Sequence, residues 1–368
     1  MRVLVVGAGV GGLATARGLV AAGHRVRVFE KAPSLRTAGA AVTLWSNGSG
    51  ILAALGVGLE GSGSPIHLLE RRAATGRSVL RLDLGHAVRR YGHGQVCLPR
   101  RDLVGLLAEG LPDGAVEFGR TCEAVAHDRD GVRVEFADGG FAEGDLLVGA
   151  DGRHSVVRAH LWGADPARPS GWTTLQGLGR IPIDVVGGTT GVHIAGPEGT
   201  CGLLPAGDGL LLWWFDVRRG PEAVKADALR RRFGHWAAPV PQVLEAITEV
   251  EEFAHHGHRV PRVWGRGRCT LVGDAAHTMP PAQAQGANQA LEDAWALVAA
   301  LRDVTDPSSA LRRYERRRSV RASRAARAAN TEATNALLPF LSLVPEGLAA
   351  RAHTLWLRSV SDYLAAHS

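Results

Sequence analysis

The chain has 368 residues, of which 45% are hydrophobic and 21% are charged, and its formal net charge is +6. This composition excludes an intrinsically disordered chain, and the length allows either two domains or one large domain with an insertion. Only Lys31 and Lys225 are lysines, so arginine carries nearly all of the basic charge. We attribute this bias to genomic base composition rather than to nucleic-acid binding.

The four cysteines, Cys97, Cys122, Cys201 and Cys269, show no CxxC spacing. This pattern predicts reduced thiols in a cytoplasmic protein rather than a metal site. No run of about 18 apolar residues is present, so we expect no membrane-spanning helix. The apolar N-terminus continues directly into a helix, which argues against a secretory signal.

The expected elements alternate between α/β segments and stretches rich in short strands. Strands are expected at residues 2–7, 25–30, 145–150 and 270–273, and helices at 12–22, 47–55, 99–111, 291–301 and 307–330, with further helix to the C-terminus broken at Pro339 and Pro345. Runs such as RSVLRLDL, GVRVEFADGG and GLLLWWFDV predict β hairpins between them. We therefore predict an α/β fold, in which a Rossmann-like domain (1–70, 95–165 and 262–330) is interrupted by a mainly β domain (71–94 and 166–261) and followed by C-terminal helices (331–368).

The segment VLVVGAGVGGLATARGLVAAGHRVRVFEK carries a GxGxxG motif at Gly7, Gly9 and Gly12, between a strand and a helix. The first glycine allows a tight turn, the second lets the backbone approach a pyrophosphate, and the third lets helix and strand pack closely. The helix N-terminus favours phosphate, and Glu30 ends the second strand, where a carboxylate binds ribose hydroxyls. A dinucleotide is therefore predicted to bind here. A second GxGxxG at 56–61 follows a helix instead of a strand, and we interpret it as a loop.

Two further motifs follow buried strands. GADGRHSVVR (149–158) places Asp151 at the end of one strand, and LVGDAAHTMPPAQAQGANQALEDA (271–294) places Asp274 at the end of another, with Gly286 opening a helix. In this order, and over about residues 1–330, the three motifs resemble the single-component FAD-dependent aromatic hydroxylases, the p-hydroxybenzoate hydroxylase-like flavoprotein monooxygenases. By its length and its pattern of α/β and strand-rich segments, the chain is most similar to the short urate, salicylate and 6-hydroxynicotinate hydroxylases.

The resemblance implies which residues hold FAD. Gly7, Gly9, Gly12 and Glu30, with the adjacent Lys31, would hold the ADP half, and the backbone at Cys122 would contact adenine. Arg100 would reach the flavin side of the cofactor, Asp151 would serve both FAD and NAD(P)H, Asp274 would bind ribityl hydroxyls, and the amides of Gly286, Ala287 and Asn288 would face the pyrimidine edge of the isoalloxazine. A helix N-terminus at that edge stabilises the negative charge of reduced flavin.

The resemblance also implies the reaction. NAD(P)H would reduce the FAD, O2 would add to form a flavin C4a-hydroperoxide, and one oxygen atom would pass to an aromatic substrate. No catalytic residue is singled out, because the cofactor carries the difficult chemistry. Epoxidation, reduction without oxygen insertion, and a non-catalytic flavin-binding sensor remain open, as does the choice between a monomer and a homodimer.

The substrate is expected between the flavin and the inserted sheet. The candidate residues are Trp45, Gln176, Thr200, Leu212, Trp214 and Pro280. Thr200 and Leu212 stand where urate-type relatives carry an arginine and a tyrosine, which favours a larger, more apolar substrate over a small anion held at that place. In LLLWWFDV we expect the Leu212 and Trp214 face to point toward the substrate. Ala284 stands where the family usually has a glycine.

Other features are interpreted as structural. HHGH (255–258) is expected to be a solvated loop rather than a metal tract, and His277 a structural residue rather than an acid or base. The arginine run 312–327 is expected to be a solvated or domain-packed helix face, and 335–344 to pack on the FAD domain rather than on a membrane or partner chain. Arg153 and Arg158 either favour a 2′-phosphate or pair locally.

Overall fold

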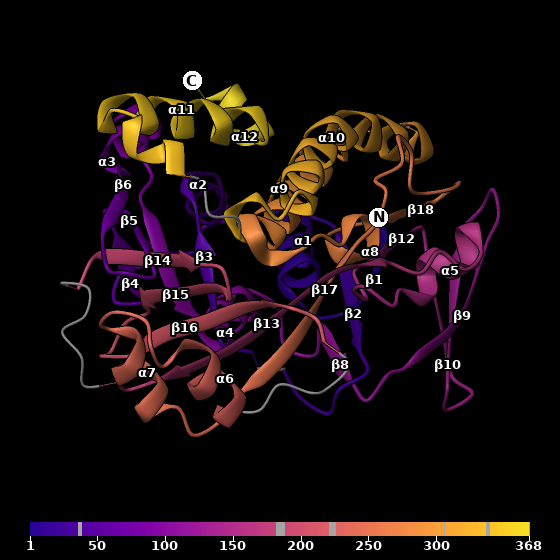
Figure 1. Cartoon of the computed structure of the whole chain (residues 1–368). Coiled ribbons are helices and arrows are strands. Elements are labelled where there is room, and N and C mark those ends of the chain that lie inside the picture. Colours follow the sequence, from indigo (N-terminus) through magenta and orange to yellow (C-terminus); the bar gives the residue numbers. More distant parts are fainter. Residues whose placement is uncertain are drawn as a thin grey trace.

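A computed structural model of the chain describes residues 1–35, 39–181, 188–220, 226–302, 304, 306–335 and 339–367. One half of the molecule is built on a five-stranded parallel sheet in the order β18-β12-β1-β2-β8 (Figure 1). Its strands are β1 (Arg2–Val6), β2 (Arg25–Glu30), β8 (Val116–Phe118), β12 (Leu146–Gly149) and β18 (Cys269–Leu271). Four of these strands, β1, β2, β12 and β18, were predicted from the sequence, and the apolar runs of β1, β12 and β18 are typical of a parallel sheet covered on both faces.

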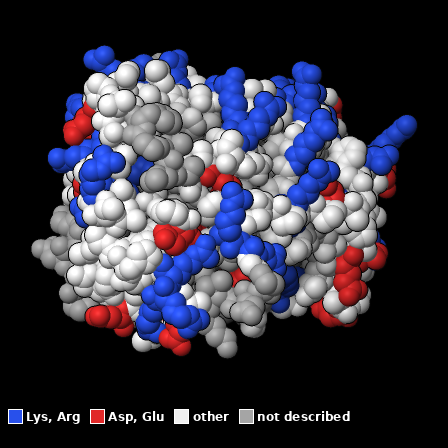
Figure 2. All heavy atoms as spheres, viewed as in Figure 1, with Lys and Arg blue, Asp and Glu red and all other residues white. Residues whose placement is uncertain are grey.

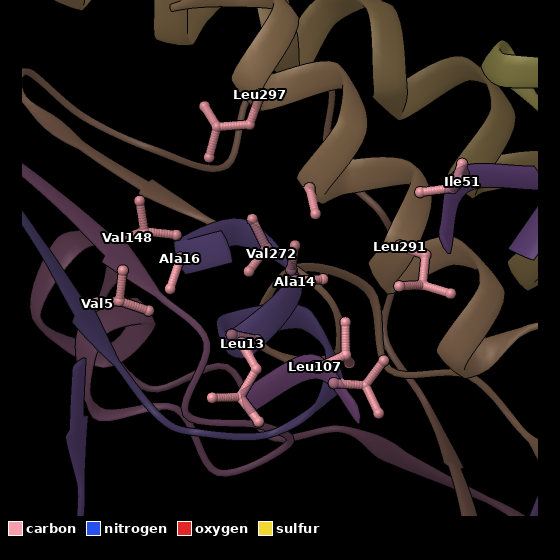
Figure 3. Packing of buried hydrophobic residues seen from close by; sticks show 14 of the residues in the cluster. Val5, Leu13, Ala14, Ala16, Ile51, Leu107, Val148, Val272, Leu291 and Leu297 are labelled. Atoms are coloured by element: carbon pink, nitrogen blue, oxygen red, sulfur yellow. The ribbon is translucent and has the colours of Figure 1, made fainter. Parts of the chain in front are cut away.

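Helix α1 (Val10–Ala21) is the centre of this half and packs against helix α9 (Gly286–Ala300). Figure 3 shows Leu13, Ala14 and Ala16 of α1 among side chains of the sheet and of α9. A methyl group at Gly18 would meet the side chain of Val298 at 2.7 Å, so the close contact of the two helices requires a glycine there. This packing brings the start of α9 next to the glycine turn.

The same half contains two small antiparallel sheets and further helices, among them the short α8 (Asp274–His277). The sheets are β11-β10-β9, formed by β9 (Cys122–His127), β10 (Val132–Phe136) and β11 (Phe141–Gly144), and β3-β7-β4, formed by β3 (Ala41–Leu44), β4 (Ser64–Ile66) and β7 (Gln95–Pro99). The other helices include α2 (Ser46–Ala54), α4 (Arg100–Ala108) and α5 (Val156–Trp162). Helices α2 and α4 agree with the helices expected at 47–55 and 99–111, apart from their ends.

The other half is a seven-stranded mixed sheet in the order β17-β13-β16-β15-β14-β5-β6. Its strands are β5 (Leu68–Ala73), β6 (Ser78–Asp83), β13 (Arg168–Gly179), β14 (Thr190–Gly196), β15 (Gly199–Pro205), β16 (Leu211–Arg218) and β17 (Glu251–Gly257). Helices α6 (Ala226–Phe233) and α7 (Val240–Ala246) cover one face (Figure 1) and form a separate core with it. We call this the outer face, and the opposite one, which packs toward the nucleotide-binding half, the inner face.

The C-terminal segments pack partly where the sequence did not predict. They are helix α10 (Pro307–Asn330), the turns η2 (Ala333–Asn335) and η3 (Pro339–Leu343), and helices α11 (Glu346–Ser359) and α12 (Asp362–Ala366). Within the described part of 335–344, η3 contacts β6. The helix that follows this stretch, α11, contacts β6 and α3 (Gly85–Tyr91). The expectation that this region packs on the FAD domain is therefore wrong for η3, whereas α12 does contact α2 and α9. Residues 336–338 lie outside the described residues.

The arginine run of α10 has one buried member. The Arg318 side chain is fully buried and donates from Nε to Asp293 Oδ1 at 2.8 Å and from Nη1 to Asp362 Oδ2 at 3.1 Å. Its neighbours Arg316 and Arg317 are exposed, and Figure 2 shows the basic side chains of one face in several separate groups. The helix face is thus partly packed into the domain and partly solvated.

The HHGH stretch is not a solvated loop. His255 lies within β17 and is fully buried, and its ring is hydrogen-bonded to Thr174 of the sheet and to Glu332 after α10. Among the described residues, no cluster of histidine, cysteine or carboxylate side chains could hold a metal ion. The four cysteines are buried free thiols, and no described helix is long and apolar enough to cross a membrane.

We expect Arg318→Met to lower the free energy of unfolding by about 3–5 kcal/mol, because it leaves buried carboxylates without their cation. Equilibrium unfolding in denaturant measures this free energy of unfolding for both proteins. The matched control is Arg316→Met, an exposed position on the same helix, which should change stability by less than about 0.5 kcal/mol. Equal effects of the two substitutions would contradict this assignment.

Candidate active site

The glycine turn after β1 has the geometry that its motif predicts. Gly7 has a φ of +105°, and a methyl group there would collide with the carbonyl of Ala150. A methyl group at Gly12 would collide with the Gly7 carbonyl, so both glycines are required by close packing. Gly9 differs, because nothing lies within 4 Å of the position its methyl group would take. The open side of the turn therefore lies at Gly9, at the start of α1.

Glu30, at the end of β2, holds this turn in place. Its Oε2 accepts a hydrogen bond from the amide of Ala8 at 2.8 Å, and its Oε1 accepts one from the amide of Ala32 at 3.0 Å. The carboxylate is buried, whereas the neighbouring Lys31 is exposed. Each carboxylate oxygen has a further lone pair, so a ribose hydroxyl could bind without breaking either bond.

Asp151, in the second motif, caps helix α5. Its carboxylate accepts hydrogen bonds from Ser155 Oγ at 2.6 Å and from the amides of Val156 at 2.7 Å and Val157 at 3.1 Å. Burial raises the pKa of Asp151, and these hydrogen bonds oppose the rise. The residue thus organises its own loop, and its contacts with FAD and NAD(P)H stay a prediction.

Arg158 joins the second motif to the third. Its Nη1 donates to the carbonyl of Ala275 at 2.7 Å, and its Nη2 donates to the carbonyl of Arg153 at 2.9 Å. The Arg153 side chain lies 2.8 Å from Nδ1 of His256. Arg158 is therefore engaged locally, which is one of the two alternatives expected from the sequence.

Asp293, on helix α9, organises the third motif. Its carboxylate accepts hydrogen bonds from the Gly273 amide at 2.8 Å and from Arg318, and it pairs with His277 Nε2 at 2.6 Å. Burial alone would raise the pKa of Asp293, but His277 and Arg318 lower it below its ordinary value. His277 thus has the structural role expected of it, and Asp274 remains exposed among buried neighbours.

The start of α9 is fixed by the side chain of Asn288. Asn288 Oδ1 accepts from the Trp45 amide at 3.0 Å, and its Nδ2 donates to the Thr43 carbonyl at 2.9 Å and to the Ala284 carbonyl at 2.8 Å. The Trp45 indole donates to the carbonyl of Gln283 at 3.2 Å. The side chains of Trp45 and Asn288 are therefore occupied in joining β3 and α2 to α9.

Comparison with known proteins agrees with this geometry. A family model described as an FAD binding domain matches residues 1–329. The chain belongs to this family. It is 37% identical over 330 residues to 3-amino-4-hydroxybenzoate 2-monooxygenase of Streptomyces platensis, covering 85% of this chain and 83% of that protein. It is 33% identical to the FAD-dependent urate hydroxylase of Klebsiella oxytoca, with 86% of each chain covered.

A solved relative has the same overall structure. Klebsiella pneumoniae HpxO in complex with FAD and uric acid has a TM-score of 0.85 and 28% identity, and the match covers all of this chain and 95% of that one. The resemblance proposed from the three motifs is confirmed, and the protein is an FAD-dependent monooxygenase of the aromatic hydroxylase type.

The described residues of the flavoprotein fit FAD. Gly9 and Gly286 both border open space, so a cofactor could approach either backbone closely. The first hydrogen bond within α9 runs from the Gln289 amide to the Gln285 carbonyl at 2.8 Å, so the preceding amides of Gly286, Ala287 and Asn288 point out of the helix. These amides could donate hydrogen bonds to the carbonyl oxygens and ring nitrogens of a flavin. The exposed Asp274 carboxylate could accept hydrogen bonds from the hydroxyls of its ribityl chain.

Three other residues were predicted to contact the cofactor or the substrate. Arg100 is the exposed first residue of α4, and its side chain lies against Gly39. Cys122 starts β9, and burial raises the pKa of its thiol to about 12, so the thiol stays neutral. Pro280 is buried and precedes η1 (Pro281–Gln283). Their contacts with cofactor and substrate stay predictions.

The predicted substrate residues of the sheet share its inner face. Leu212 and Trp214 pack with the nucleotide-binding half, whereas Leu211 and Trp213 pack under α6 and α7. Gln176 pairs with Trp214 across β13 and β16, and its amide donates to Glu251 at the edge strand at 3.1 Å. The alternation predicted for this strand is therefore present in the structure.

Thr200 belongs to a buried polar cluster that the sequence did not predict. Its hydroxyl donates to Asp216 Oδ2 at 3.2 Å, and Thr174 donates to the other oxygen of Asp216. His255 lies 2.6 Å from Thr174 Oγ1 and 2.8 Å from Glu332 Oε1, which joins the sheet to the segment after α10. The HHGH motif was the only sequence signal of this cluster. Thr200 is fully buried within it.

We expect Gly9→Ala to weaken FAD binding by about 10- to 100-fold while leaving the apoprotein folded, because the added methyl group enters the open side of the turn. Titration of the apoprotein with FAD, followed by flavin fluorescence, measures this. Gly105→Ala, at an uncrowded position within α4, is the control and should leave the affinity unchanged. An unchanged affinity in Gly9→Ala would contradict the placement of the cofactor.

We expect Ala284→Gly to raise the free energy of unfolding by up to about 1 kcal/mol, because Ala284 has a left-handed φ of +47° that glycine adopts without strain. Equilibrium unfolding of the apoprotein in denaturant measures this change in the free energy of unfolding. The control Ala282→Gly, two residues earlier in η1, should be neutral or destabilising. A loss of stability in Ala284→Gly would show that the backbone at this position is unstrained.

Proposed function

We propose that this monooxygenase inserts one atom of O2 into an aromatic substrate, with NAD(P)H as the reductant of its FAD. The observation that carries the proposal is the convergence of three segments. A methyl group at Gly11 in α1 and one at Gly273 after β18 would both lie close to the Cβ of Ala290 in α9, at 3.3 and 3.2 Å. This close packing supports a single site bordered by the glycine turn, the Asp274 loop and the α9 amides.

In this reaction the residues of the chain bind and orient the cofactor and the substrate, and they protect the reacting atoms from water. The chemistry that FAD supplies when bound is reduction by NAD(P)H and activation of O2. The N-terminal amides of α9 favour negative charge at the edge of the ring system. The inner face of the seven-stranded sheet, with Leu212 and Trp214, provides an apolar wall that excludes water from the reacting atoms.

The relatives support an aromatic substrate, since their names specify 3-amino-4-hydroxybenzoate and urate. Thr200 and Leu212 stand in place of the arginine and tyrosine of urate-type relatives. Thr200 is fully buried in the Asp216 cluster, so the absence of that arginine, together with Leu212, favours a bulky, largely apolar, natural-product-like compound for this chain. We also propose that the enzyme acts in the cytoplasm as a monomer or homodimer without nucleic acid, and the four free cysteines are consistent with a reducing compartment.

The test measures oxidation of NADPH and NADH in air by the FAD-loaded protein. The panel contains phenols, hydroxybenzoates including 3-amino-4-hydroxybenzoate, uric acid, hydroxyquinolones, indoles and polycyclic aromatics. We expect at least one compound to accelerate oxidation at least about tenfold and to yield a product heavier by one oxygen atom.

Three outcomes would change the proposal. Acceleration with an epoxide product would favour an epoxidase, and acceleration without oxygen insertion would favour a reductase. No acceleration by any compound, with FAD bound stoichiometrically, would favour a flavin-binding sensor.

A further inference from the structure

Helix α11, near the C-terminus, exposes apolar side chains to solvent. Leu348 and Leu355 are 58% and 64% exposed, and Leu343, in the turn η3 that leads into the helix, is 82% exposed. These three are the most exposed large hydrophobic side chains of the part of the chain that the structure describes. Single exposed leucines are common on protein surfaces, but several of them gathered at one place mark a surface that binds another molecule.

The spacing of these residues forms an apolar row along one face of α11. Leu348 and Leu355 are seven residues apart, which is two helical turns, and the exposed Ala352 lies between them on the same face. The opposite face, which includes Ala350 and Leu357, is buried, and the helix packs against β6 and α3. A helix that is apolar on both faces is normally covered on both, whereas the chain itself covers only one face of α11.

Arginines line one side of the apolar row. Arg351 and Arg358 are exposed, and each follows a leucine of the row by three residues, so both lie on the same side of it. Burial raises the pKa of Tyr91, and the charges of Arg358 and Arg90 oppose this rise, so Arg90 of α3 also lies close to this side. We call Arg90, Arg351 and Arg358 the basic flank.

The basic flank has no acidic counterpart beside it. The nearby carboxylates of Glu346 and Asp83 already pair with arginines, Glu346 with Arg81 at 4.0 Å and Asp83 with Arg89 at 3.3 Å. Over the described ranges of the chain, no carboxylate forms an ion pair with any arginine of the basic flank. Its positive charge is therefore available to an anionic partner.

The surroundings of the row suit contact with an extended surface. In Figure 1, α11 lies at the top of the molecule, outside β6 and α3, and Figure 2 shows basic side chains along the upper edge of the same view. Trp356 follows Leu355 by one residue and so lies on the side of the row away from the basic flank, where it is half-buried. Tryptophan is common where an apolar surface meets water, including the surface of a membrane.

We propose that the apolar row and its basic flank bind the surface of an anionic membrane, with α11 lying in the plane of the headgroups. The leucines enter the boundary between headgroups and acyl chains, and the arginines contact the phosphates of anionic lipids. Charge favours this occupant over a second copy of the chain, because a symmetric interface would face the row with the same arginines and no free carboxylate. Most of the surface lies in α11, beyond the stretch 335–344 that the sequence predicted to pack on the FAD domain. The inference concerns where the enzyme binds, and it does not depend on the proposed reaction.

The test is co-sedimentation of the FAD-loaded protein with lipid vesicles. Vesicles of phosphatidylcholine alone are compared with vesicles of equal parts phosphatidylcholine and phosphatidylglycerol. We expect the protein to bind the anionic vesicles at least about tenfold more tightly, and added salt to weaken this binding, because salt screens surface charge. Leu348→Ser combined with Leu355→Ser should lower the affinity for anionic vesicles at least about tenfold. Arg351→Gln combined with Arg358→Gln should lower it about fivefold for each charge removed.

Two controls separate this surface from general properties of the protein. Phe141→Ser removes an apolar side chain that is 52% exposed on β11. Arg219→Gln combined with Arg231→Gln removes the same total charge from exposed positions after β16 and in α6. Both controls should change vesicle binding by less than about twofold, because charges far from the membrane are screened. FAD content and thermal unfolding verify that each variant is folded, and if the leucine variant does not fold, the comparison of the two vesicles and the arginine variants still decides the question.

The proposal is overturned if the wild-type protein binds neither kind of vesicle, if it binds both equally, or if the controls weaken binding as much as the variants of α11. It is also overturned if sedimentation without lipid shows a dimer that Leu348→Ser with Leu355→Ser converts to a monomer, because the row would then belong to an interface between two copies of the chain. The proposed function is judged separately, by NAD(P)H oxidation and oxygen insertion in the absence of lipid.

Discussion

The arrangement of the active site depends on one buried carboxylate, that of Asp293. It accepts the amide of Gly273, pairs with His277 and binds Arg318. These partners come from the loop after β18 and from α10, so a single side chain of α9 fixes the positions of both. A buried carboxylate is stable only when its charge is matched and its lone pairs are filled. The start of α9 and the loop that follows β18 are therefore held against each other.

The polar residues of the three motifs mostly bind one another. Glu30 holds the glycine turn, Asp151 caps α5, and Arg158 reaches the carbonyl of Ala275 in the third motif. The groups left available to a cofactor are backbone amides, open glycine surfaces and the Asp274 carboxylate. This division is physically reasonable, because a flavin bound by preorganised backbone groups requires rigid loops behind them.

The seven-stranded sheet performs two tasks because its side chains alternate. One face forms a closed apolar core with α6 and α7, in which Trp213 and Phe215 are buried. The inner face is mixed: it carries Leu212 and Trp214, the buried Asp216–His255–Glu332 cluster that anchors the sheet to the end of α10, and the side chains of Arg71 on β5 and His193 on β14. The polar groups of the Asp216 cluster satisfy one another, which is what a buried polar network requires.

The sequence by itself determined the α/β fold, the glycine turn, the order of the three motifs and the two faces of β16. These follow from local rules: apolar runs, glycine spacing and the two-residue period of a strand. Only the tertiary structure decided that His255 is buried, that η3 packs on β6, and that Arg71 lies beside His193. Such neighbours depend on strand register and on contacts between residues more than 70 positions apart, and no local pattern encodes that pairing.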